Sequence, residues 1–520
     1  MSLRNHRAVG AVVAAASSAR LGWLLVLLGA VLRIAQYASG RSLWLDETYV
    51  AFNVLTKSYR GLLGTLDWGQ GAPPGFTLGT KLLVAAFGSS VYVFWLLPLL
   101  AGLISLLLFR RLAQLTLPAV AANGALALFA VNAGLIRYSS ELKPYEFDVA
   151  ATLGVLVVGL LAWRRGFGPR DALTLAVVGL LAVFFSYPAV LVLVAVLIGA
   201  ALAIALARRR DAVRGFALVA GIWAAAFAVV YAVFVPNLEK LQEHDLDVFY
   251  LPLPPTSGAE LHRLGSALGG ELAGDVALGL PTAIAVIAGA LIVLSPLYLA
   301  RRSLFAALEL VLIVIVTVIA AGADQYPWGG RFTLFLVPVL IVCVFGGACA
   351  LVSVRSGATA ASLLVIAVLA VPVAEAAYHL FVPRNIEESK PLIDRLARQW
   401  RTGDTLYLNA SAQFAFRYYT QYRGDGSPLW TIRPAPGGPA ATAPALRSVP
   451  PWLFVAPSAV TSQALAHRAE RLAAQHRRVW VLVTHLDDAN LRPFERPPSS
   501  VRLVESNRAT GAALYLLAGR

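Results

Sequence analysis

Residues 21–47, LGWLLVLLGAVLRIAQYASGRSLWLDE, decide what class of protein this is. They begin with an apolar run over residues 21–38, which is long enough to cross a bilayer core roughly 30 Å thick as a helix. Two adjacent carboxylates, Asp46 and Glu47, follow at the predicted membrane edge. Carboxylates are costly near hydrocarbon, and proteins keep them there for function or shield them with a partner. The pair is therefore the first candidate site.

The composition of the whole chain is that of an integral membrane protein. Of 520 residues, 58% are hydrophobic and 14% are charged, and the mean hydropathy is +0.70. Soluble domains carry roughly 25% charged residues. The apolar residues form many runs of about 18 to 24 residues, and none alternates in the way of an outer-membrane barrel strand. The predicted fold class is a polytopic α-helical membrane protein.

The formal net charge of +15 is distributed in a way that predicts topology. Basic residues cluster at every second junction between apolar runs, and positive residues in short loops stay cytoplasmic. Nucleic acid is therefore not needed as a partner to explain the charge. The clusters are Arg4, Arg7 and Arg20; Arg110 and Arg111; Arg164, Arg165 and Arg170; Arg208, Arg209, Arg210 and Arg214; Arg301 and Arg302; and Arg355.

About eleven membrane helices are predicted from these runs. With the N-terminus in the cytoplasm, an odd number places the C-terminus on the extracytoplasmic side. The expected location is the plasma (inner) membrane of a bacterium. The first run contains Arg33, which is unusual for the core of a secretory signal, so we expect an uncleaved anchor. The predicted helices lie near residues 21–38, 90–109, 117–136, 146–163, 171–186, 188–207, 215–235, 278–299, 304–322, 331–353 and 357–380.

The chain becomes ordinary soluble sequence from about Val382. The sequence predicts a transmembrane module over residues 1–381 and an extracytoplasmic soluble α/β domain over residues 382–520. Helices are predicted at 386–400 and 464–475, strands at 405–408, 479–483, 501–504 and 514–517, and a loop or linker at 434–451.

Three further groups on the predicted outer face combine charges with aromatic side chains. They are RYSSELKPY at 137–145, the turn at Tyr187-Pro188, and ADQYPWGGR at 323–331. The mixed signs suit a site that holds both a base and an anion. Arg331, Lys143 and Arg137 can bind a phosphate, because arginine does so bidentately and lysine acts as a point charge.

Each candidate also has a purely structural interpretation. Asp46 would N-cap a helix from Glu47 to about Thr56, with Glu47 complementing the helix dipole. The three cations would snorkel to headgroups, and Tyr138, Tyr145, Tyr326 and Trp328 would belong to an aromatic belt. Glu141 is harder to dismiss, since it would share a helical face with Tyr138 and lies near Lys143. His244, Asp245 and Asp247 are weak candidates for a divalent cation.

The combination of these motifs resembles a known family. An Arg-containing first helix, then Leu-Trp-Leu-Asp-Glu at 43–47, a Pro-Pro stretch at 73–74, and Tyr-x-x-Glu-x-Lys-x-Tyr at 138–145 are similar to the GT-C superfamily of polytopic glycosyltransferases. Within it the pattern most resembles glycosyltransferase family 39 and its relatives, including protein O-mannosyltransferases and aminoarabinose transferases. The resemblance covers about residues 20–355.

The resemblance implies inverting transfer of a sugar from a polyprenyl-phosphate donor to an acceptor hydroxyl at the extracytoplasmic face. Asp46 would be the general base, and Glu47 would support Asp46, hold the acceptor or cap the following helix. Lys143, Arg331 and Arg137 would stabilise the leaving phosphate. Glu141 and Tyr145 would contact the donor sugar or orient Lys143, and Tyr138, Tyr187, Tyr326 and Trp328 would line the donor site. The acceptor would be a lipid, glycan or protein, and a divalent cation stays open.

Three other functions remain as alternatives. A surface-polysaccharide polymerase or ligase would use a lipid-linked oligosaccharide, so it would differ from the favoured function in the size of the donor and not in its arrangement in the membrane. A transporter or flippase of lipid-linked sugar would place charges near the bilayer midplane, often in inverted repeats, whereas here the charges gather at one face and no repeat is visible. A docking domain on a membrane anchor would need one helix rather than about eleven.

Overall fold

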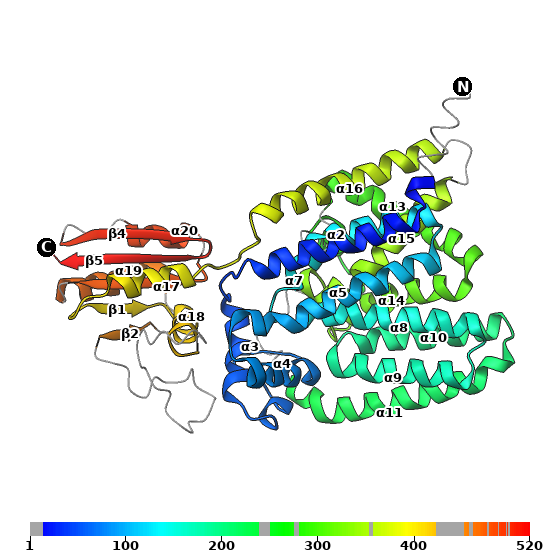
Figure 1. Cartoon of the computed structure of the whole chain (residues 1–520), viewed down its shortest axis with the longest axis horizontal. Coiled ribbons are helices and arrows are strands. Elements are labelled where there is room, and N and C mark those ends of the chain that lie inside the picture. Colours follow the sequence, from blue (N-terminus) through cyan, green and yellow to red (C-terminus); the bar gives the residue numbers. More distant parts are fainter. Residues whose placement is uncertain are drawn as a thin grey trace. The chain divides into compact units, whose positions relative to one another are not determined.

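The computed structural model describes residues 14–238, 250–274, 280–352, 357–422, 452–456, 461–475, 478–486, 488–495, 497 and 500–519 (Figure 1). Within these residues, nine helical segments are long and apolar enough to cross a membrane. The polytopic α-helical class is therefore confirmed. The segments belong to α2 (Ala19–Ala38), α5 (Val91–Thr116), α8 (Tyr145–Arg165), α10 (Ala189–Leu206), α11 (Val213–Leu238), α13 (Thr282–Arg302), α14 (Leu304–Gly322), η5 with α15 (Gly330–Leu336 and Val337–Val352) and α16 (Gly357–Phe381).

Two of the eleven expected spans are shorter helices. In the first, α6 (Ala119–Val131) ends at Asn132, whose side-chain oxygen accepts a hydrogen bond from the backbone N–H of Leu135 at 2.9 Å and so starts a new helix, α7 (Ala133–Tyr138). An Asn that caps a new helix interrupts the apolar run. The second is α9 (Pro169–Phe185), whose first turn carries Arg170 and Asp171. The difference from eleven therefore comes from helix breaks and polar ends.

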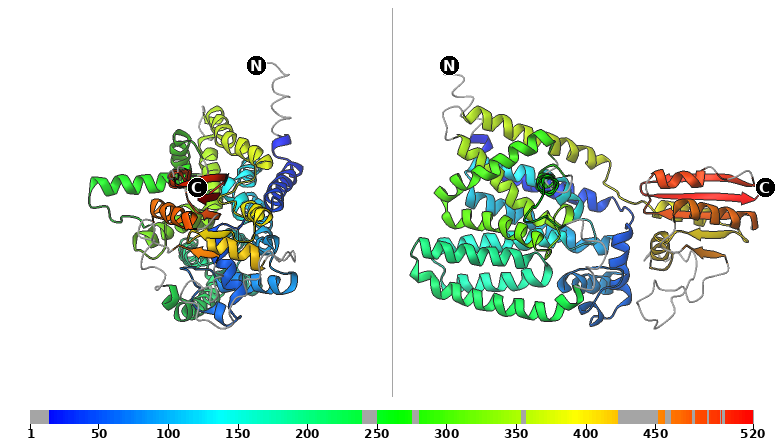
Figure 2. Two further views of the ribbon diagram at one scale, coloured as in Figure 1. Left: turned by 90° about the vertical axis from the view of Figure 1, so that its left-hand side faces the viewer. Right: turned by 180° about the vertical axis from the view of Figure 1, so that it is seen from behind.

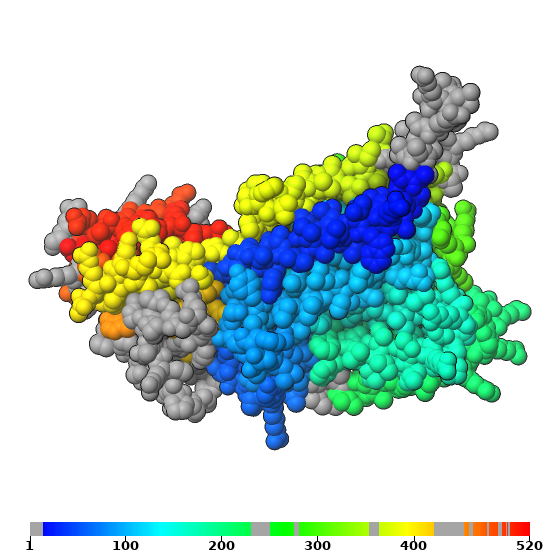
Figure 3. Space-filling view, in the orientation of Figure 1, coloured from blue at the N-terminus to red at the C-terminus, as the bar shows by residue number. Residues whose placement is uncertain are grey.

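The helices pack through close aromatic and glycine contacts. Phe109 of α5 stacks on Phe129 of α6, with ring centroids 4.2 Å apart. Gly29 of α2 lies against Leu106 and Ala130, where even a methyl group would collide. Helix α9 packs between α8 and α11 (Figure 1). The outward faces stay apolar: Trp23, for example, is 54% exposed on α2, which lies beside α16 on one face of the bundle (Figure 3).

Shorter helices lie in the segments that connect the spans. They are α3 (Leu45–Thr56), the 3₁₀ turn η1 (Gly61–Leu63), α4 (Pro74–Phe87), η2 (Arg210–Ala212) and α12 (Gly258–Ala273). Helices α3 and α4 both lie between the first span and the second span of the sequence. Helix α12 was not predicted, and its N-cap is Ser257, whose hydroxyl accepts from the Glu260 amide at 3.2 Å.

The C-terminal part contains a five-stranded sheet with the order β2-β1-β3-β5-β4 (Figure 2). Strand β1 (Thr405–Leu408) pairs in parallel with β2 (Leu453–Val455) and β3 (Val479–Thr484), whereas β5 (Ala512–Gly519) is antiparallel to β3 and to β4 (Val501–Ala509). The helices are α17 (Lys390–Gln399), α18 (Ala412–Arg417) with a π-helical turn (Tyr418–Tyr422), α19 (Ser462–Gln475) and α20 (Asp488–Glu495). The expected α/β character is confirmed.

The chain divides into two compact units. The first contains residues 1–38, 71–77 and 95–383, and the second contains residues 39–70, 78–94 and 384–520. The segment that carries the acidic pair thus packs with the C-terminal sheet as one unit. The predicted boundary between residues 381 and 382 stays a prediction, and residues 434–451 lie outside those that the structure describes.

Candidate functional site

The two carboxylates of the acidic pair have different surroundings. Helix α3 begins at Leu45 and its N-cap is Trp44, so Asp46 does not occupy the capping position that the structural interpretation gave it. Glu47 supplies the cap instead, because its Oε2 accepts from the Trp44 backbone N–H at 3.3 Å. Glu47 is also buried against Arg41, with Nη1 of Arg41 2.7 Å from the same oxygen. Its charge is therefore neutralised within the protein.

Asp46 is half-buried and keeps a polar environment. Its Oδ1 accepts a hydrogen bond from Nε2 of Gln70 at 3.0 Å, and the same Gln70 nitrogen donates to the Trp68 carbonyl at 3.2 Å. Burial, followed by the negative fields of Asp46 and Glu387, raises the pKa of Tyr49 to about 12. The hydrogen bond from Gln70 therefore fixes the orientation of the Asp46 carboxylate. Asp46 also lies in the first turn of α3, where the helix dipole favours a negative charge.

The segment 137–145 is not a continuous helix. Helix α7 ends at Tyr138, and residues 139–144 form turns and bends before α8 starts at Tyr145. The prediction that Tyr138 and Glu141 share a helical face is therefore wrong. Glu141 is instead buried in an ion pair with Arg137, whose Nε is 3.2 Å from Oε2 of Glu141.

Aromatic rings bring this segment together with the 326–333 turn. Tyr138 and Tyr145 pack edge to face at 5.1 Å, and Tyr145 meets Phe332 at 6.3 Å. The guanidinium of Arg331 lies over Tyr145 at 6.0 Å and over Phe332 at 5.3 Å. Such stacking fixes the plane of an arginine guanidinium.

Lys143 contributes a second cation to the same membrane unit. It is only 5% exposed, and its backbone N–H donates to the Glu141 carbonyl at 2.7 Å. A lysine that snorkels keeps its amine at the protein surface, and this one does not.

The turn that carries Arg331 is fastened to α12. Trp328 donates from its indole nitrogen to the Ala267 carbonyl at 3.1 Å, and the Thr333 hydroxyl donates to Oε2 of Glu271. Burial raises the pKa of Glu271 to about 7, against the opposing effect of Thr333 and the Gly330 backbone. Tyr326 donates to the Phe332 carbonyl at 2.8 Å. Trp328 and Tyr326 thus have structural contacts that a lipid-facing aromatic belt would not require.

A buried polar group near α8 contains Arg33, which was already notable in the sequence of the first span, and Glu146 and Asp148, which were not predicted as site residues. Arg33 of α2 is fully buried and donates from Nη1 to the carbonyls of Gly29 and Ala130 at 3.2 and 3.3 Å. It interacts electrostatically with Glu146, while Asp148 interacts with Ser186. Charged residues inside apolar runs could have indicated this group from the sequence.

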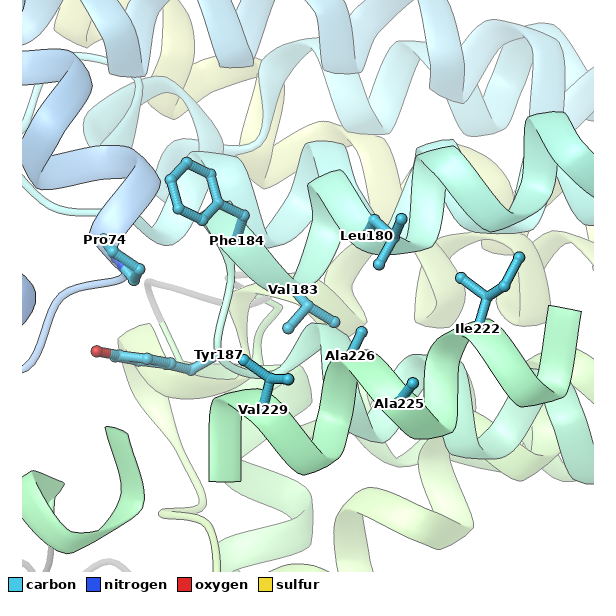
Figure 4. Close-up of a pocket in the computed structure, with 9 residues that line it drawn as sticks. All are labelled: Pro74, Leu180, Val183, Phe184, Tyr187, Ile222, Ala225, Ala226 and Val229. Atoms are coloured by element: carbon cyan, nitrogen blue, oxygen red, sulfur yellow. The ribbon is translucent and has the colours of Figure 1, made fainter. Parts of the chain in front are cut away.

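Tyr187 lies between α9 and α10 and borders an apolar cavity of about 460 Å³ (Figure 4). Its hydroxyl donates to the Ala72 carbonyl at 2.9 Å. The cavity is lined by α9 and α11 and by Pro74 (Figure 4). Its other residues are Leu180, Val183, Phe184, Ile222, Ala225, Ala226 and Val229.

A metal centre is not evident in the part of the chain that the structure describes. Within it, no group of three or more His, Cys, Asp or Glu side chains could hold an ion. The weak metal candidates His244, Asp245 and Asp247 lie outside the described residues.

Solved structures share the arrangement of these helices. The chain has a GT-C-type fold, as the resemblance of its motifs predicted. The solved structure of ArnT from Cupriavidus metallidurans in the apo state matches 96% of this chain and 98% of its own, with 15% identity and a TM-score of 0.50. ArnT is an aminoarabinose transferase.

Two other solved structures match less well. ArnT bound to undecaprenyl phosphate covers the same shares, 96% and 98%, at 15% identity with a TM-score of 0.38. The oligosaccharyltransferase AglB from Archaeoglobus fulgidus, in complex with an inhibitory peptide and a dolichol-phosphate, covers 89% of this chain and 69% of its own at 12% identity, with a TM-score of 0.49. No protein-family model and no curated protein matches the sequence.

Proposed function

We propose that this protein is a GT-C-type glycosyltransferase that transfers a sugar from a polyprenyl-phosphate donor to an acceptor hydroxyl, with Asp46 as general base. The observation that carries the proposal is the different environment of the two adjacent carboxylates. Arg41 neutralises Glu47 in a buried ion pair, whereas Asp46 is half-buried and oriented by Gln70. A fold shared with an aminoarabinose transferase supports it.

The proposed reaction proceeds in one displacement. The acceptor hydroxyl oxygen forms a bond to the anomeric carbon while its proton passes to an Asp46 carboxylate oxygen. The bond between that carbon and the phosphate oxygen breaks, and its electron pair leaves on the lipid phosphate. The anomeric configuration is inverted, and Asp46 later returns the proton to water. Such general-base help contributes about 10²–10⁴-fold to the rate.

The leaving phosphate needs cations more than it needs a proton donor. Arg331, stacked on Tyr145 and Phe332, and the buried Lys143 are assigned this role. Arg137 pairs with Glu141, so it is assigned mainly to holding that carboxylate for the donor sugar. The edge-to-face pair of Tyr138 and Tyr145 would form part of the donor site, with Tyr326 and Trp328 holding the adjacent turn.

The isoprenoid chain of the donor would lie in the apolar cavity beside Tyr187. Its volume of about 460 Å³ falls in the range of ordinary ligand sites, roughly 300–1,000 Å³. A bulky side chain at Ala226 should fill it, so Ala226→Trp should raise the KM for a long-chain donor. Val286→Trp, on an outward face of α13 where Val286 is 70% exposed, is the matched control. Equal KM values for the two variants would remove the cavity from the proposal.

The protein is proposed to lie in a bacterial plasma membrane with its N-terminus in the cytoplasm. The reaction would then occur at the extracytoplasmic face. The alternation of basic clusters between apolar runs supports this orientation.

A direct assay tests the proposed function. The purified protein is supplied with undecaprenyl- and decaprenyl-phosphate sugars of several kinds and with candidate acceptors, and released lipid phosphate is measured. Asp46→Asn should lower the rate by about 10²-fold or more, whereas Asp211→Asn, at an exposed position in η2, should not. Wild-type turnover by Asp46→Asn would exclude Asp46 as the base. Absence of release by the wild type with every donor would exclude the function.

A further inference from the structure

Four consecutive residues before Asp46 interact with the C-terminal part of the same compact unit. Residues 39–70 and 384–520 belong to this second unit. The segment Ser42-Leu43-Trp44-Leu45 leads into the helix that presents Asp46. Each of its residues has a partner between residues 384 and 520.

Ser42 is held on both of its polar groups. Its backbone N–H donates to Oε1 of Glu388 at 2.9 Å, and its hydroxyl donates to Oε2 of the same carboxylate at 3.2 Å. The backbone N–H of Lys390 donates to the Ser42 hydroxyl oxygen at 2.9 Å. Glu388 in turn donates from its own N–H to the Thr510 carbonyl at 2.8 Å, beside the turn between β4 and β5. Residues 388–390 therefore fix the first residue of the segment.

Leu43 and Trp44 are held by side chains from two different parts of the sheet domain. The Leu43 N–H donates to the hydroxyl oxygen of Tyr419 at 2.8 Å, and Tyr419 is only 2% exposed. The Trp44 indole stacks on His485, with centroids 6.4 Å apart and planes 22° apart. His485 follows β3, and its N–H donates to the Gly511 carbonyl at 2.9 Å. These contacts leave the chain little freedom before α3.

Glu387 faces the start of α3 from a buried position. Burial raises the pKa of Glu387 to about 8. The charges of Glu47 and Glu388 raise this pKa further, whereas hydrogen bonds from the Leu45 backbone and the Thr484 side chain lower it. Nδ1 of His485 lies 3.9 Å from Oε2 of Glu387. The field of Glu387 also reaches Tyr49, as does that of Asp46.

Aromatic contacts hold the part of α3 that follows Asp46. Phe414 of α18 packs edge to face on Tyr49 at 4.7 Å and meets Phe52 at 6.0 Å. The guanidinium of Arg417 lies over the Phe52 ring at 5.0 Å. Helix α3 is therefore bound to α18 after Asp46 and to the 387–390 segment before it.

We propose that residues 384–520 position the Asp46 base, with Glu388 and Tyr419 as positioning residues for the transfer reaction. The inference rests on the proposed function. The C-terminal part supplies no reacting atom in this account. It sets the direction in which the first turn of α3 presents Asp46, and a misplacement of about 1 Å at a catalytic group can cost on the order of 10²-fold in rate.

The test uses Tyr419→Phe in the full-length protein. This change removes the acceptor of the Leu43 N–H and keeps the ring. We expect kcat to fall about tenfold, with the KM for the lipid donor unchanged. Hydrogen–deuterium exchange should rise in the peptide that covers residues 39–47. Glu505→Gln is the matched control, because Glu505 pairs with Arg395 on the exposed side of the same domain at 2.6 Å.

Rescue by a conservative variant separates positioning from loss of folding. Glu388→Gln keeps one acceptor for the Ser42 N–H, so it should retain most of the rate, whereas Glu388→Ala should lose about tenfold. Both variants should keep the melting temperature of the wild type to within a few degrees. If Glu388→Ala and Tyr419→Phe keep the wild-type kcat and the wild-type exchange of residues 39–47, the inference is overturned.

The exchange measurement needs no substrate, so it distinguishes the two proposals. Faster exchange in residues 39–47 of Tyr419→Phe supports the contact even if no donor is turned over, in which case the proposed function alone fails. Normal kcat in Tyr419→Phe, with Asp46→Asn inactive, overturns the positioning role and leaves the function in place.

Discussion

Nη1 of Arg41 lies 2.7 Å from Oε2 of Glu47, and both side chains are at least 95% buried. Replacing both residues of a buried ion pair changes the stability of a protein little. Removing one residue destabilises the protein strongly, because the other charge stays buried without a partner. Removing one residue of this pair should therefore lower the stability of the protein measurably.

Arg41→Met should destabilise the protein by about 3–5 kcal/mol, since it leaves the Glu47 charge buried. Arg41→Met combined with Glu47→Gln should recover much of this loss, because Gln still accepts from the Trp44 N–H. Denaturant unfolding in detergent, analysed as a double-mutant cycle, measures both values. Additive losses in the double variant would show that the two side chains are not coupled.

Glu387 should make stability depend on pH. Its folded-state pKa of about 8 exceeds its ordinary value of 4.5, so between those values the folded protein holds a proton that the unfolded chain releases. Stability from this group is thus fully present below about pH 4.5 and is lost as pH rises toward 8.

Replacing Glu387 with Gln removes that dependence. The wild type should lose stability as pH rises, and Glu387→Gln should not. The melting temperature of the variant minus that of the wild type should therefore increase by several degrees between pH 5 and pH 8. The titratable groups that interact with Glu387 include Glu47, Tyr49, Glu388 and His485. Glu505→Gln, at an exposed ion pair, serves as the control. A constant difference across this pH range would contradict the buried, protonated state.

Arg331 should determine affinity for the lipid phosphate. Arg331→Ala should raise the donor KM by at least about tenfold, and Arg331→Lys should restore part of the affinity, because lysine keeps the charge but loses the planar fork and the stacking. Arg301→Ala, at the exposed end of α13, is the matched control. Inhibition by free undecaprenyl phosphate measures the same affinity without turnover. Equal inhibition of wild type and Arg331→Ala would remove Arg331 from the donor site.

Thr333→Val should weaken donor binding through the turn that carries Arg331. It removes the hydroxyl that donates to Glu271, so the turn loses one of its contacts with α12. We expect a donor KM several times higher, with a smaller change in kcat. Thr174→Val, at an exposed position on α9, should leave both constants unchanged. A fall in kcat at constant KM would assign Thr333 a different role.

Two glycines test the packing of the spanning helices. A methyl group at Gly347 of α15 would lie 2.0 Å from the Leu291 carbonyl oxygen of α13, whereas one at Gly221 of α11 meets nothing within 4 Å. Gly347→Ala should therefore separate α13 from α15 and abolish a cooperative melting transition. Gly221→Ala should melt at or slightly above the wild-type temperature, because Ala favours the helix. Similar melting curves for the two would contradict the close contact.

The sequence predicts the fold best where one physical signal dominates. Apolar runs gave nine spanning segments among the described residues, and strand β1 has the predicted bounds 405–408. Helix α12 was missed because Gly265, Gly269 and Gly270 weaken its helical pattern, although its cap at Ser257 was visible. The strand β4 extends to Ala509 because it pairs along the whole of β5, which local composition does not reveal.

The site was predictable in its residue types and not in its pairings. Asp46, Arg331 and Lys143 could be selected because charges at a membrane edge are costly. That Glu47 rather than Asp46 meets Arg41 depends on where the first turn of α3 begins, which is two residues earlier than expected. The partners of Ser42 and Leu43 lie 346 and 376 residues away, beyond any local pattern.

The composition of the second unit has a consequence for engineering. Residues 39–70 and 78–94 pack with residues 384–520, so the C-terminal part cannot be exchanged between related transferases through a single splice after α16. A chimaera that grafts only residues 384–520 would place a foreign carboxylate and phenol against Ser42 and Leu43. A functional graft should instead carry all three stretches, and its splices after residues 77 and 94 would fall inside α4 and α5, where the helical backbone must stay continuous.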